Sequence, residues 1–208
     1  MDANSYGVNF SIWTQITEGL SWRVQKSLDD GADINKMVWY NNDEPSGMTH
    51  MTGLHIAAVC GQTRIVTLLV ENGANISIRD SLGRTPLHCA VRESEEECSE
   101  ILLQKGSDIN TECNLGETPL HTAVKLGDLD MVRMLLRYKA SVLKPSSIGR
   151  VAMWYAFAHW EMTQFIEQEE LTTAICLAFA MSHHPRLGDK SMPAVLDEEV
   201  LRMVIKLV

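Results

Sequence analysis

Thr85-Pro86-Leu87-His88 recurs as Thr118-Pro119-Leu120-His121, 33 residues further along the chain. One step of 33 residues earlier, the related Thr52-Gly53-Leu54-His55 occupies the same place. A glycine two positions ahead of the threonine position keeps this period, at Gly83, Gly116 and Gly149. A fixed period of this length predicts an array of stacked units, in which each unit contacts only its neighbours.

Each motif predicts the start of a helix. Threonine caps the helix, and proline at the first helical position gives up only an N–H that has no intrahelical partner. Amphipathic runs follow at residues 65–69 and 131–136, and Gly106 then predicts a left-handed end of the second helix. Lys139 stands at that place in the next unit, where we expect a more strained turn.

The period, the motif and the small residues after it resemble the ankyrin repeat family, whose unit carries T-P-L-H-x-A, a turn and two helices. The resemblance implies an all-α solenoid of about five helix-turn-helix units, with a C-terminal helical extension. The expected repeat domain spans residues 10–170, with clear repeats at 50–82, 83–115 and 116–148 and degenerate ones at 10–49 and 149–170. Nine extra residues fall between repeats one and two, within residues 36–51.

Residues 171–208 leave the repeat, and an apolar stripe after Asp197 predicts a helix there. The helix can be a cap that seals the last repeat. It can instead be a docking helix, because ankyrin proteins often end in segments that recruit ubiquitin ligases. This alternative would make the chain a substrate adaptor of a ubiquitin ligase.

Composition narrows the class of partner and the compartment. The chain has 208 residues and a net charge of −9, which argues against nucleic acid and anionic membranes as ligands. Its longest apolar stretch, residues 174–181, is far short of the roughly 20 residues needed to cross a bilayer. Five cysteines without C-x-x-C spacing favour reduced thiols in a cytoplasmic or nuclear protein, which we expect to be a monomer.

The sequence carries no catalytic, cofactor-binding or metal-binding motif of the common classes, so we predict a non-enzymatic protein without a cofactor. His55, His88 and His121 recur at the repeat period. Equivalent positions in stacked helices lie roughly 8–10 Å apart, whereas zinc ligands lie about 2 Å from the metal. Each histidine is therefore predicted to hydrogen-bond the backbone of a turn.

The resemblance implies that a protein partner binds the concave face, through the finger tips and the outer side of each first helix. The candidate partner-binding residues on this mapping are Trp39, Tyr40, Met48, Met51, Val59, Ser81, Leu82, Arg84, Arg92, Asn114, Leu115, Glu117, Lys125, Leu126, Ile148 and Arg150.

Several of these candidates are apolar where solvent would favour polar residues: Met48, Met51, Leu82, Leu115, Leu126 and Ile148. A row of apolar residues at one period would form a protein-contact patch, or the leucines would brace one finger against the next. Trp39 and Tyr40 would anchor a partner or cover the first repeat. The sequence thus predicts a protein–protein interaction scaffold.

Overall fold

The computed structural model describes residues 14–40, 49–142, 144–150, 152 and 155 and contains a row of stacked helix pairs. The first helices of three pairs are α3 (Gly53–Val59), α5 (Pro86–Arg92) and α7 (Pro119–Leu126), and their second helices are α4 (Thr63–Glu71), α6 (Glu96–Gln104) and α8 (Leu129–Arg137). Helix α2 (Ser21–Asp29) precedes them and packs on α4. The predicted helical solenoid is confirmed.

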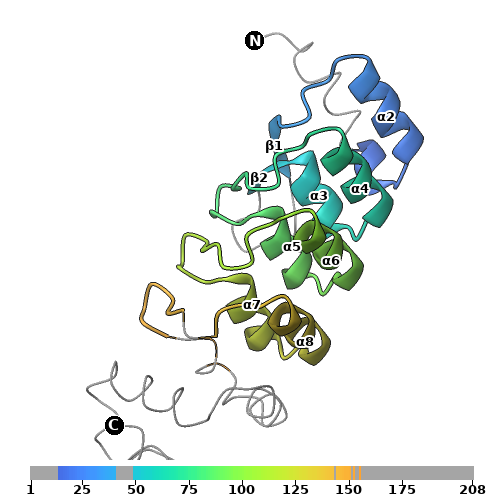
Figure 1. Cartoon of the computed structure of the whole chain (residues 1–208). Helices are drawn as coiled ribbons and strands as arrows, with labels where there is room; N and C mark the ends of the chain where they lie inside the picture. The colour runs from blue at the N-terminus through green and yellow to red at the C-terminus, as the bar shows by residue number, and fades with distance from the viewer. Residues whose placement is uncertain (1–13, 41–48, 143, 151, 153–154, 156–208) are drawn as a thin grey trace, which may run out of the picture.

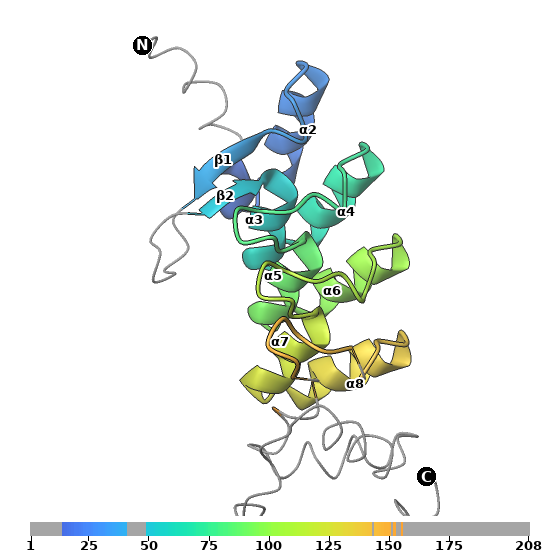
Figure 2. The ribbon, with the colours of Figure 1, turned by 90° about the vertical axis from the view of Figure 1, so that its left-hand side faces the viewer.

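The helices form two layers (Figures 1 and 2). In the inner layer α5 packs between α3 and α7, and in the outer layer α6 packs between α4 and α8. The loops that join one pair to the next project away from the helices as finger loops, on the side of the inner layer (Figure 1). Because the main contacts run between neighbouring pairs, the core of the described residues is a band that runs along the stack.

The repeated motif starts each inner helix as the sequence predicts. Thr52, Thr85 and Thr118 are extended N-cap residues whose side chains accept a hydrogen bond from the third helical N–H. The leucine of each motif is buried, as are the small residues that follow it; Ala90 and Ala123 are fully buried. Small side chains at these positions allow neighbouring inner helices to approach closely.

The extra residues before the second repeat form a β-hairpin, which the helical prediction did not include. Strand β1 (Met37–Tyr40) pairs antiparallel with β2 (Thr49–Thr52), and Trp39 lies opposite His50. The second strand leads directly into α3. The insertion therefore converts the first finger into a two-stranded ribbon, whereas the later fingers are tight turns.

Two turns hold non-glycine residues in the left-handed region. Lys139 has φ 66° where the preceding repeat has Gly106 at φ 93°, so the strained turn expected at Lys139 is confirmed. Ser94 has φ 59° in the turn between α5 and α6, where the preceding repeat has Gly61 at φ 63°. This conformation brings the Cβ of an L-residue close to the following carbonyl oxygen.

In the part of the chain that the structure describes, no helix combines the length and apolar character needed to cross a bilayer. The helical extension expected at residues 171–208 lies outside the described residues, as does most of the fifth repeat.

Candidate protein-binding surface

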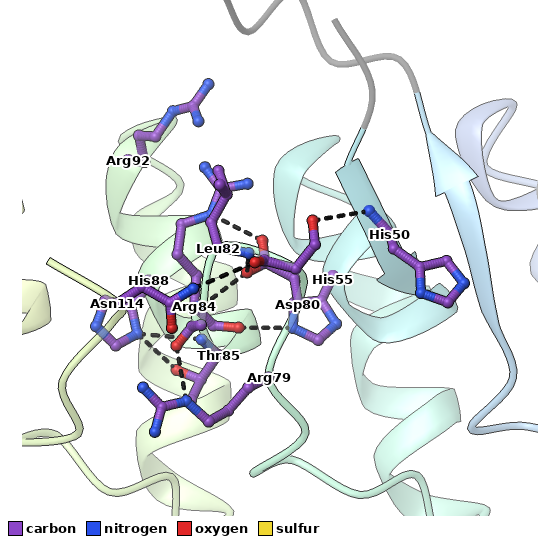
Figure 3. Close-up of polar contacts among 12 residues, drawn as sticks. His50, His55, Arg79, Asp80, Leu82, Arg84, Thr85, His88, Arg92 and Asn114 are labelled. Atoms are coloured by element: carbon purple, nitrogen blue, oxygen red, sulfur yellow. Dashed lines mark hydrogen bonds and ion pairs between the residues drawn. The ribbon is translucent and has the colours of Figure 1, made fainter. Parts of the chain in front are cut away.

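The three motif histidines tie each inner helix to the finger of the next repeat. The Nε2 atom of His55 lies 3.0 Å from the main-chain oxygen of Arg84 (Figure 3). His88 makes the same contact with Glu117 at 3.1 Å, and His121 with Arg150 at 3.0 Å. The predicted hydrogen bonds from histidine to turn backbone are confirmed, and each one crosses a repeat boundary.

These contacts define the protonation of the rings. A main-chain oxygen only accepts, so Nε2 carries the proton and donates it. The Nδ1 atom of His88 is then an acceptor, and it lies 3.2 Å from the Thr85 N–H and 2.9 Å from the Thr85 hydroxyl. Burial lowers the pKa of His88 to about 4, against the opposing effect of the bond to the Glu117 carbonyl. Burial likewise lowers the pKa of His55 and of His121.

All three rings are thus neutral structural groups near neutral pH. Among the described residues, no group of three or more histidine, cysteine, aspartate or glutamate side chains is arranged to hold a metal ion. Both ring nitrogens of each motif histidine are engaged by protein groups. The role of these histidines is structural: each one hydrogen-bonds the finger of the next repeat.

Each of the three later fingers closes on itself through two backbone hydrogen bonds, one of which spans the base of the turn. The N–H of Asp80 donates to the Arg84 oxygen at 2.8 Å, and Cys113 and Ser146 make the equivalent bond in the next two fingers. In the first of these turns the Asp80 carboxylate also accepts from the Leu82 and Arg84 N–H groups and pairs with the Arg84 guanidinium at 2.8 Å (Figure 3). The histidine of the preceding helix binds the same carbonyl that closes the finger.

Backbone hydrogen bonds also join successive finger tips. The N–H of Ser81 donates to the His50 oxygen at 3.2 Å, which connects the β-hairpin to the next finger. Asn114 donates to the Leu82 oxygen at 3.0 Å, and Ser147 donates to the Leu115 oxygen at 3.2 Å. The fingers are therefore held together by their backbones, in one ladder along the solenoid.

Because backbone hydrogen bonds already hold neighbouring fingers together, the apolar side chains at the tips are not required for that contact. Leu115 and Ile148 are 64% and 62% exposed, while Leu82 is half-buried. We call Leu82, Leu115 and Ile148 the finger-tip row. Side chains so exposed make little contact with the neighbouring finger, which favours the patch over the brace at Leu115 and Ile148.

The β-hairpin separates the two aromatic candidates. Trp39 is 62% exposed, and its ring stacks on that of His50 with centroids 5.0 Å apart. Tyr40 is half-buried, and its hydroxyl lies 3.7 Å from Cys60 Sγ. The anchor expectation thus fits the exposure of Trp39, and Tyr40 packs toward the second repeat.

Some candidates are less accessible than expected. The expectation that Met51 faces solvent is wrong, because strand β2 directs this side chain into the core and leaves it fully buried. Arg84 and Glu117 are also buried as whole residues, at 8% and 9% exposure, because their charged groups pair within the fold. Met48 lies outside the described residues.

The remaining candidates lie at the surface or partly at it. Those that are exposed are Ser81, Asn114, Lys125 and Leu126, and those that are half-buried are Val59, Arg92 and Arg150. Lys125 Nζ contacts both carboxylate oxygens of Glu117, at 2.9 and 3.0 Å.

Two residues that support this surface, Tyr155 and His50, carry no signal in the repeat pattern of the sequence. Tyr155 donates its hydroxyl to Glu117 at 3.3 Å, and Lys125 lies over its ring at 5.4 Å from the centroid. His50 stacks on Trp39. Tyr155 sits in a degenerate repeat without a motif to mark it. His50 lies in the insertion, outside the repeated motif.

The fold and the surface define a class of protein: a repeat solenoid that displays side chains on fingers of fixed spacing. The sequence profile described as ankyrin repeats (three copies) matches residues 24–113 and 54–146, which together cover more than half of the chain. The chain belongs to the ankyrin repeat family, whose repeats are protein-interaction modules and generally not enzymes.

Individual relatives share single stretches with this chain. A putative ankyrin repeat protein of Rickettsia bellii is 58% identical over 43 residues, which cover 21% of this chain and 18% of the relative. Mouse protein phosphatase 1 regulatory subunit 12A is 38% identical over 63 residues, or 28% of this chain and 6% of the relative. Rat Arf-GAP with coiled-coil, ANK repeat and PH domain-containing protein 2 is 38% identical over 69 residues, or 33% and 8%. The chain thus spans less than a fifth of the length of these relatives.

Proposed function

We propose that this chain is a non-enzymatic scaffold that binds another protein through its finger tips and the adjoining concave face. The observation that carries the proposal is the exposure of Leu115 and Ile148, at 64% and 62%, on fingers whose backbones are hydrogen-bonded to their neighbours. Large apolar side chains on a rigid support favour binding, because little conformational entropy is lost when a partner covers them.

The mechanism is rigid display. Each exposed tip is fixed by backbone bonds within its finger, by a histidine from the preceding inner helix and by a backbone bond to a neighbouring finger. Trp39 extends the surface toward the N-terminal end, since the β-hairpin joins the same ladder through His50 and Ser81. Family membership supports a binding function without catalysis.

We place this function in the cytosol or nucleus. The described cysteines, Cys60, Cys89, Cys98 and Cys113, carry free thiols, which supports a reducing compartment. The ligase-adaptor alternative depends on residues 196–208, which lie outside the described residues, and no observation on this chain favours it.

The test is affinity purification from native cells followed by mass spectrometry. The intact chain is compared with a Leu115→Ser/Ile148→Ser variant and with Trp39→Ala. Trp22→Ser is the matched control, because Trp22 is as exposed as Trp39, at 63%, but lies on the outer helix α2.

We expect at least one protein to be retained by the intact chain and by Trp22→Ser and to be lost with the Leu115/Ile148 double variant. Retention of every co-purified protein by the double variant would refute binding through the finger tips. Circular dichroism of the purified variants checks that they are folded, and we expect it to be unchanged, because these side chains contribute little buried area.

A further inference from the structure

We propose that the partner presents an acidic amphipathic helix, with apolar residues at every seventh position, along the finger-tip row. This inference rests on the proposed function and specifies its partner. Two properties of the row support it: the spacing of its aliphatic side chains, of which Leu115 and Ile148 are exposed and Leu82 is half-buried, and the sign of the charge exposed beside them.

The spacing is set by the repeat. Leu82, Leu115 and Ile148 are each 33 residues apart, and the backbone bonds between finger tips hold them in line. Stacked helices lie roughly 8–10 Å apart. An α-helix rises 1.5 Å per residue, so residues seven apart lie on one face about 10.5 Å apart. A helix parallel to the solenoid can therefore place one apolar residue against each tip.

The spacing argues against an extended strand, and the kind of side chain in the row argues against a polyproline helix. In an extended strand, residues on one face are separated by about 6.6 or 13 Å, since alternate side chains point to opposite faces. A polyproline helix returns to the same face at about 9 Å, but such segments dock in grooves lined by aromatic side chains. Every member of the finger-tip row is aliphatic, as is usual where an amphipathic helix binds.

The charge beside the row favours an acidic partner. In the ion pair of Asp80 and Arg84, the side chains are 0% and 10% exposed. In the pair of Glu117 and Lys125, they are 12% and 42% exposed. In both pairs the carboxylate is the inner group and the cation the outer one. Arg84 itself is almost enclosed, so the cation exposed beside the row is Lys125, although the whole chain carries a net charge of −9. Arg92 also lies on this face, paired with the exposed Glu93 at 3.2 Å.

The test uses four fluorescent peptides and the full chain, with binding followed by fluorescence anisotropy. The first peptide is three heptads long, with leucine at every seventh position and glutamate on the flanking positions. The second has the same composition with leucine at every fifth position, which scatters the leucines around the helix. The third replaces glutamate by lysine, and the fourth is a proline-rich peptide with leucine at every third position.

We expect the first peptide to bind at least about tenfold more tightly than the other three, because each buried leucine and each favourable charge pair adds to affinity. Leu115→Ser/Ile148→Ser should weaken this binding at least about tenfold, and Trp22→Ser should leave it unchanged. Equal binding of the second or fourth peptide would overturn the helix. Equal or tighter binding of the lysine peptide would overturn the acidic partner.

Affinity purification of the native partner distinguishes failure of the helix inference from failure of the proposed function. If the acidic heptad peptide does not bind but a co-purified protein still depends on Leu115 and Ile148, the helix inference is wrong and the proposed function stands. If no co-purified protein depends on these residues, the proposed function fails as well.

Discussion

At the scale of single residues, the motif histidine performs two tasks with one ring. Its Nδ1 accepts from the capping threonine of its own helix, and its Nε2 donates to the finger of the following repeat. The imidazole ring is suited to this position, because its two nitrogens lie on opposite sides and act as acceptor and donor in the neutral state. Local helix capping and contact between repeats therefore depend on the same side chain.

This arrangement makes stability depend on pH. The pKa of His88 is about 4 in the folded state and about 6.5 when unfolded. The stabilising contribution of the neutral ring is fully present above about pH 6.5. It falls as the pH drops from about 6.5 to about 4, because within this range the unfolded state binds the proton more readily than the folded state does. The expected loss for His88 is about 3 kcal/mol across this window, and His55 and His121 act in the same direction.

Urea unfolding between pH 7 and 4.5 checks this dependence. His88→Gln should reduce the slope of unfolding free energy against pH by about 1.4 kcal/mol per pH unit, one proton's worth. An unchanged slope would count against a neutral His88. If the variant does not fold, an NMR titration of the wild-type histidines gives the same answer, with His88 neutral down to about pH 4.

At the scale of elements, a short turn joins the two helices of each pair. One residue of each turn adopts the left-handed backbone conformation. The turn between α3 and α4 uses Gly61, and that between α7 and α8 uses Gly127, both in the left-handed region. The turn between α5 and α6 places Ser94 there with φ 59°. The element tolerates this residue because both flanking helices are anchored in the core by buried side chains, Val91 and Cys98 among them.

Ser94→Gly should therefore stabilise the fold by about 0.5–1 kcal/mol, since relief of the left-handed strain exceeds the added backbone entropy of glycine. The midpoint of urea unfolding measures the change. The reciprocal Gly61→Ser should destabilise, because a Cβ there adds the same strain and meets the Glu95 carboxylate. A Ser94→Gly variant less stable than the wild type would show that the turn is held by contacts of the serine.

At the scale of the whole molecule, stability passes from neighbour to neighbour along the stack. Helix α5 packs between α3 and α7, and Leu87 at its start is fully buried. A defect in α5 therefore weakens two interfaces at once, whereas a defect in α2 affects the packing on α4 at one end of the row.

Leu87→Ala should cost about 3 kcal/mol, from lost apolar burial and the cavity left behind. Hydrogen–deuterium exchange should show reduced protection in α3 and α7 as well as in α5. Leu126→Ala is the control, because this leucine of α7 is 50% exposed and its truncation should change protection little. Loss of protection confined to α5 would contradict coupling between neighbouring repeats.

The sequence by itself determined the period, the helix starts and the role of the motif histidines. These features depend on contacts within one repeat or between adjacent repeats, and the same residues recur at a fixed spacing: Thr85 and Thr118, His88 and His121. The left-handed turn at Lys139 was predictable for the same reason, since glycine occupies that place in the preceding repeats.

Only the tertiary structure decided which surface candidates are accessible. Met51 and Leu115 are both apolar and both fall in finger segments, yet one is fully buried and the other is 64% exposed. The difference arises because the insertion turns the first finger into a paired ribbon, and the alternation of its second strand directs Met51 inward. Similarly, contacts with Lys125 and Tyr155 keep the Glu117 side chain from solvent. Tyr155 belongs to a repeat that carries no motif, so this contact could not be read from the sequence. Burial is a property of what packs around a residue, and that information lies far from the residue in the sequence.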